Sequence, residues 1–169
     1  THKVVKDTKA GGETISNAVE ARAMSKGKEL GGGKYDGLAW LYDEGVIDEE
    51  GVKLGMSNKM QEVYDDTNGK SKKFEVSDMV DAYAAAMHAG DNRQAQFDAA
   101  LDFIDEQVED GVWSEKKGAD LAVAMGQVLT ISVPKEQEPS AQWAKKYGEV
   151  GQQLILAQMT GTQRLNYNE

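Results

Sequence analysis

The sequence predicts an all-α protein, a compact bundle of six to seven helices that follows an irregular, Gly-rich N-terminal arm. Three observations lead to this prediction. Apolar residues recur at helical spacing along most of the chain, capping residues and glycines separate the periodic stretches, and no alternating run is long enough to indicate a sheet. Hydrophobic residues make up 40% of the 169 residues and charged residues 28%, a balance typical of a globular domain rather than a disordered or membrane-spanning chain.

The first 33 residues are expected to form a basic, Gly-rich arm that contains one short helix. Residues 1–13 are predicted to be irregular, because they lack periodicity and end in two glycines. From Ile15 onward apolar residues recur at positions i, i+4 and i+8, which predicts a helix over residues 14–30. Three consecutive glycines then break the pattern and predict a hinge, formed by Gly31, Gly32 and Gly33.

The remaining helices are assigned to a single helical domain over residues 34–169. A short helix is predicted over residues 36–44, and a longer one from its cap at Asp48 to residue 64, where a turn rich in Asp stops it. Four more helices follow, each with apolar residues at helical spacing and a capping residue or a glycine at an end. The predicted N-caps are Asp48, Asp91, Ser114 and Ser140, and the predicted terminators are Gly90 and Gly111.

Glycine is unusually frequent, with 18 residues against only 2 prolines. Several glycines fall inside predicted helices, among them Gly37 and Gly55. Each would cost up to about 1 kcal/mol relative to alanine in a helix interior. Interior glycines at this density therefore predict close approach between helices, or helices that depend on a neighbour for stability.

Two stretches, residues 43–49 and 109–115, match at a constant offset of 66 positions. Each has an acidic pair, a Gly that can adopt the left-handed conformation, two apolar residues and a capping residue. This pattern predicts two similar helix–corner–helix hairpins, over residues 36–64 and 97–131. Gene duplication and convergence on common corner residues both explain the match. The corner residues expected to pack inward are Val46, Ile47, Val112 and Trp113.

Charge is distributed unevenly along a chain whose net charge is −10. Residues 1–34 carry seven basic and four acidic side chains, whereas residues 35–110 carry six basic and nineteen acidic ones. A basic arm before an acidic middle predicts docking of the arm on an acidic neighbouring surface. The candidate interaction residues are Lys3, Lys6, Lys9, Lys26, Lys28, Lys34, Trp40 and Trp143.

No residue is assigned a catalytic, cofactor-binding or metal-binding role. The loop of residues 64–75 places Gly69 at the sixth position of a calcium-loop pattern, but Tyr64 stands where the first acidic ligand is needed. Three lysines in that loop also oppose a cation. With two His and no Cys in the chain, a zinc site or a His-based triad is not expected.

These features favour a non-enzymatic structural or assembly subunit of a larger complex, such as a virus or phage particle. Its expected partners are copies of itself or other subunits, with no cofactor and no membrane span, in the cytoplasm or the virion. Nucleic acid is not an expected partner, except through the arm, since a net charge of −10 disfavours general binding. Two alternatives stay open: an acidic regulatory or inhibitory protein of the nucleic-acid-mimic type, and a carboxylate-dependent helical hydrolase.

Overall fold

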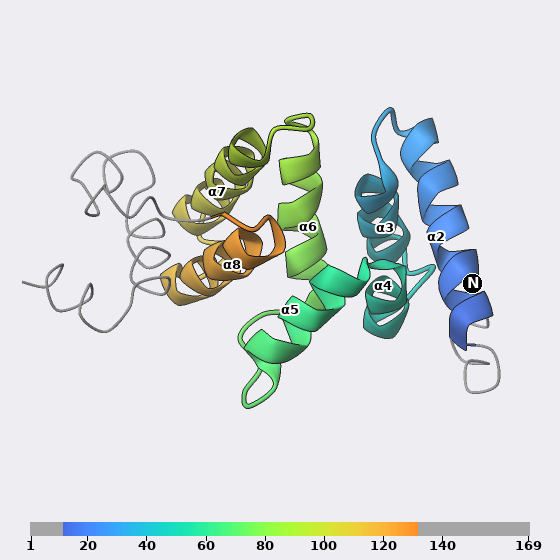
Figure 1. Ribbon diagram of the computed structural model, residues 1–169, viewed down its shortest axis with the longest axis horizontal. Helices are drawn as coiled ribbons and strands as arrows, with labels where there is room; N and C mark the ends of the chain where they lie inside the picture. The colour runs from blue at the N-terminus through green and yellow to red at the C-terminus, as the bar shows by residue number, and fades with distance from the viewer. Residues whose placement is uncertain (1–11, 132–169) are drawn as a thin grey trace, which may run out of the picture.

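The computed structural model describes residues 12–131, which form seven α-helices and no strand (Figure 1). This confirms the all-α prediction. The arm of residues 1–11 and the predicted helix after Ser140 lie outside the described residues. Within them, α6 lies between two groups of helices, since it packs against α3 and α4 on one side and against α7 and α8 on the other.

The helix α2 (Gly12–Glu29) packs along α3 (Lys34–Asp43), and glycines lie where the two backbones meet. A Cβ atom placed on Gly37 of α3 would overlap with the carbonyl group of Ala23 in α2. A Cβ on Gly27 would likewise overlap with the carbonyl oxygen of Gly33. The predicted close approach of helices is therefore confirmed here, and α2 is part of the core because Val19 and Ala23 are buried.

The single helix expected over residues 48–64 is wrong, because the chain forms two helices, α4 (Glu49–Gly55) and α5 (Asn58–Asn68). Ser57 starts the second one, since its side chain accepts a hydrogen bond from the backbone N–H of Met60 at 3.3 Å. The Ser57 N–H itself donates to the hydroxyl of Tyr35 in α3 at 3.1 Å. The apolar residues at helical spacing continue across this break, and all four are buried: Val52, Met56, Met60 and Val63.

The remaining helices are α6 (Val76–Met87), α7 (Arg93–Glu109) and α8 (Glu115–Val128). The predicted caps Asp48 and Ser114 are confirmed, since each accepts a hydrogen bond from the backbone N–H three residues later. The predicted cap Asp91 is wrong by one residue. Asn92 caps α7 instead, with its side-chain oxygen 2.9 Å from the N–H of Ala95.

The two predicted corners have the same backbone geometry. Gly45 and Gly111 both adopt positive φ angles, of 73° and 76°. The residue after each glycine donates its N–H to a carbonyl five residues back, Val46 to Leu41 at 2.8 Å and Val112 to Gln107 at 2.9 Å.

Packing differs between the two residues of each corner. Ile47 and Trp113 are buried in the core, as predicted. The prediction for Val112 is wrong, because its side chain is 64% exposed, whereas Val46 is partly buried against the core. The second apolar residue of each corner therefore anchors the turn, whereas the first is partly buried in one corner and exposed in the other.

Candidate functional site

A cleft of about 510 Å³ opens between α3 and α6 and is the candidate functional site. The turn after α2 closes one end of it, and Phe103 of α7 contributes to a wall. Its polar lining consists of acidic side chains and one histidine, and its apolar lining includes two aromatic rings. The residues around it are Leu30, Gly31, Gly32, Asp36, Ala39, Trp40, Asp43, Asp81, Ala84, Ala85, His88 and Phe103.

Helical periodicity explains how α3 and α6 each contribute two polar side chains to the lining of the cleft. Asp36 and Asp43 are seven residues apart on α3, and Asp81 and His88 are seven residues apart at α6. Seven residues are about two turns, so each pair shares one face of its helix. The packing of α3 against α6 turns both faces toward the cleft.

Asp81 is the most perturbed titratable group in the described part of the chain. Burial raises the pKa of its carboxyl group to about 7, and the negative charge of Asp43 adds to the increase. The charges of Asp78 and Glu49 act in the same direction. Within residues 12–131 no cation forms an ion pair with Asp81 or Asp43. These two carboxyl groups therefore have no ion-pair partner in the described region.

Asp36, in contrast, already has partners. Its carboxylate oxygens lie 2.8 and 2.9 Å from Nε2 of His88, and one of them accepts a hydrogen bond from the N–H of Gly33 at 2.9 Å. The latter bond caps α3, so Asp36 has a structural role at the helix start. His88 is the C-cap residue of α6 and joins α6 to α3 through Asp36.

Trp40 forms part of the apolar wall and holds a cation. The ammonium group of Lys26 lies 4.0 Å from the centroid of the Trp40 ring, within the range of a cation–π interaction. The same Lys26 pairs with Glu29 at 3.3 Å. Phe103 is fixed by an edge-to-face contact with Trp113, with ring centroids 5.7 Å apart. The cleft therefore combines carboxylates with aromatic faces, a combination that suits a cationic group.

The structure brings some of the sequence-predicted residues together at this cleft. Gly31, Gly32 and Trp40 line it, and Lys26 stacks on Trp40. The predicted hinge forms a closed turn, in which Gly32 donates its N–H to Gly27 at 2.8 Å and Gly31 has a φ of 77°. Whether this turn moves as a hinge stays a prediction.

The other predicted interaction residues are not at the cleft. Lys34 pairs with Glu20 at 3.4 Å, Lys28 is exposed on α2, and Gly33 is the N-cap of α3. Four candidates lie outside the described residues: Lys3, Lys6, Lys9 and Trp143. The carboxylates of the cleft were missed as a set, since the seven-residue spacing within each pair was their only signal in the sequence.

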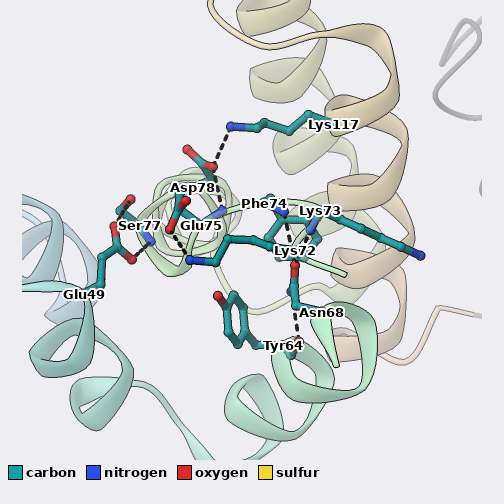
Figure 2. A network of polar contacts seen from close by, with 10 residues as sticks. All are labelled: Glu49, Tyr64, Asn68, Lys72, Lys73, Phe74, Glu75, Ser77, Asp78 and Lys117. Atoms are coloured by element: carbon teal, nitrogen blue, oxygen red, sulfur yellow. Dashed lines mark hydrogen bonds and ion pairs between the residues drawn. The ribbon is translucent and has the colours of Figure 1, made fainter. Parts of the chain in front are cut away.

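The loop between α5 and α6, considered above for calcium, is organised by Asn68 (Figure 2). The side-chain oxygen of Asn68 accepts hydrogen bonds from the N–H groups of Lys73 and Phe74 at 2.8 and 3.1 Å, and its amide donates to the carbonyl of Tyr64 at 2.9 Å. Asn68 therefore stabilises this turn through hydrogen bonds, whereas in a calcium loop the bound cation has that role. Among residues 12–131 no group of three or more His, Asp or Glu side chains has the arrangement of metal ligands.

The same region ties three helices together through polar contacts (Figure 2). Lys117 of α8 pairs with Asp78 of α6 at 2.9 Å, and Glu49 of α4 accepts a hydrogen bond from the hydroxyl of Ser77 at 2.8 Å. Asp78 also accepts from the N–H of Glu75 at the start of α6, at 2.9 Å. These contacts position α6, and they leave the cleft as the better candidate for binding.

Comparison with known protein families, curated proteins and solved structures found nothing that matches this chain. No helix among residues 12–131 is both long and apolar enough to cross a bilayer.

Proposed function

We propose that this protein is a non-enzymatic assembly subunit, which joins copies of itself by docking its basic N-terminal segment on the acidic surface of a neighbouring copy. A virus or phage particle is the kind of complex it would build. The observation that supports this proposal is the acidic cleft between α3 and α6, where Asp43 and Asp81 have no cationic partner in the described region.

The charge balance supports the same proposal. Residues 12–131 contain 24 Asp and Glu against 12 Lys and Arg, whereas residues 1–11 contain three Lys and one Asp. Opposite potentials on the two surfaces would steer their encounter and favour one orientation of docking. Such an interaction between exposed charges weakens as salt screens them, with a Debye length of about 8 Å at physiological ionic strength.

The packing of α2 supports residues 1–11, rather than residues 1–33, as the proposed docking arm. The helix α2 begins at Gly12, and its residues Val19 and Ala23 are buried in the core. Removing residues 1–33 would therefore take away a core helix together with the arm. The test of the arm therefore changes residues 1–11 alone and leaves α2 intact.

Reversing the charge of the arm is expected to abolish assembly. In a variant with Lys3, Lys6 and Lys9 each replaced by Glu, the arm would repel the acidic surface of its neighbour. By light scattering we expect the wild type to form oligomers at about 50 mM salt and to dissociate at about 500 mM, because salt screens the attraction between the charges. The variant should be monomeric at both salt concentrations. The far-ultraviolet circular dichroism should be unchanged.

A matched control reverses three exposed lysines away from the arm. Lys59, Lys70 and Lys73 lie on α5 and the loop that follows it, and replacing them by Glu makes the same change in net charge. Assembly should persist in this control. If the wild-type chain is monomeric at both salt concentrations, self-assembly is wrong, and an acidic regulator that occupies the basic site of another protein becomes the better proposal.

A second candidate function, a carboxylate-dependent hydrolase, is favoured by one observation. Asp81 has a pKa of about 7 and lies in a cleft with Trp40 and Phe103 in its walls. A carboxyl group that is partly protonated near neutral pH can act as a general acid, with Asp43 as the second carboxylate. This candidate predicts glycan hydrolysis that falls as the pH rises through 7 and is lost in Asp81→Asn. A rate of zero between pH 4 and 9 would contradict it.

A further inference from the structure

We propose that the cleft between α3 and α6 is the receptor for a lysine side chain from residues 1–11 of a second copy of this chain. The ammonium group would lie between Asp43 and Asp81, with its methylene stem against Trp40 and Phe103. This inference rests on the proposed assembly function and assigns the docking site. Three features of the cleft carry it: its unpaired charge, its aromatic walls and its position relative to α2.

Only one of the three carboxyl groups in the cleft has a cationic partner. Asp36 is paired with His88 at 2.8 Å, whereas Asp43 and Asp81 have no cation within residues 12–131. The charge of Asp43 raises the cost of ionising Asp81, because like charges repel. An ammonium group placed between them would remove that repulsion and give both carboxylates a charge-assisted hydrogen bond.

The aromatic walls indicate that the incoming group is a cation with an apolar stem. The ring of Trp40 already holds the ammonium group of Lys26 at 4.0 Å. A lysine in the cleft would meet the same chemistry, because its four-carbon stem packs on apolar surface while its charged head reaches the carboxylates. A cleft of about 510 Å³ has room for such a side chain.

The position of α2 favours a second copy over the arm of the same chain. The helix α2 lies on the side of α3 that is turned away from α6 (Figure 1), whereas residues of both α3 and α6 line the cleft. Because the arm precedes Gly12, it extends from a helix on the opposite side of α3 from the cleft, and we assign the cleft to the arm of a second copy.

The first experiment measures binding of a peptide with the sequence of residues 1–11. The receptor is the full chain with Lys3, Lys6 and Lys9 replaced by Glu, so that its own arm does not compete. By calorimetry we expect Asp43→Asn with Asp81→Asn to weaken peptide binding at least tenfold. The matched control is Asp102→Asn with Glu106→Gln, which removes two exposed charges of α7 and should change affinity less than twofold.

The second experiment tests whether the arm and the cleft act between chains. Copies with the reversed arm keep an intact cleft, and copies with Asp43→Asn and Asp81→Asn keep an intact arm. Each variant should be monomeric alone, and an equimolar mixture should form a 1:1 complex by light scattering. If both variants stay monomeric when mixed, docking between copies at this cleft is wrong.

The outcomes separate the failure of this inference from the failure of the proposed function. If the control variant weakens peptide binding as much as the cleft variant does, the arm binds the acidic surface generally, and the cleft assignment is overturned while assembly stands. If the chain with the reversed arm still assembles, the proposed function is wrong even where the peptide binds the cleft. A tenfold loss confined to the cleft variant, together with complementation in the mixture, supports both.

Discussion

Replacing Gly37 by Ala is expected to lower the free energy of unfolding by about 3 kcal/mol. In an isolated helix the same change would be favourable by about 1 kcal/mol, so the expected loss comes entirely from tertiary packing. A Cβ atom at this position would overlap with the carbonyl of Ala23, and Gly27 N would lie 2.9 Å away. Both are backbone atoms of α2, which cannot move without separating the helix from α3.

This prediction is checked by chemical denaturation followed by circular dichroism. The matched control is Gly33→Ser, because nothing lies within 4 Å of a Cβ at Gly33 and Ser is a favourable N-cap residue. The control should shift the free energy of unfolding by less than about 0.5 kcal/mol. A Gly37→Ala chain as stable as the control would mean that α2 and α3 do not pack as closely as described.

Replacing Asp81 by Asn is expected to stabilise the protein, and the gain should grow with pH. Burial raises the pKa of Asp81 to about 7 in the folded chain, against about 3.9 in an unfolded one. Between these values the folded state binds a proton that the unfolded state does not, so the wild type loses stability as the pH rises from about 4 to 7. Asn carries no charge and avoids this loss.

We expect the stability difference between Asp81→Asn and the wild type to widen over that range and to stay constant above it. At pH 8 we expect this difference in the free energy of unfolding to be about 2 kcal/mol, because solvent screens the open side of the cleft and reduces the effect of the charge. Thermal unfolding at pH 4, 6 and 8 measures it. The control Asp102→Asn removes an exposed carboxylate of α7 and should show no widening. A stability difference for Asp81→Asn that is the same at all three pH values would contradict the raised pKa of this carboxyl group.

Local signals explain why much of the fold could be predicted. Asp48 and Ser114 cap helices through bonds to the N–H three residues later, and Gly111 adopts the positive φ that glycine favours. These interactions depend on residues close together in the chain, so they can be inferred without knowing the tertiary structure. The all-α class follows from the same short-range patterns.

The break between α4 and α5 could not be predicted in the same way. The apolar spacing continues across it, and Ser57 is an ordinary polar residue in that pattern. The hydroxyl of Tyr35 accepts the N–H of Ser57 from a position 22 residues earlier in the chain. The partner of that N–H is therefore supplied by a different helix, and helical periodicity contains no information about it.

By itself, the sequence determined the helical class, the caps Asp48 and Ser114, and both glycine corners, because each depends on contacts within a few residues. It also determined the contrast between a basic segment of residues 1–11 and an acidic remainder. Only the tertiary structure decided that Asp43 and Asp81, 38 positions apart, face one cleft. Periodicity places each on a face of its own helix, but the packing of α3 against α6 determines which faces meet.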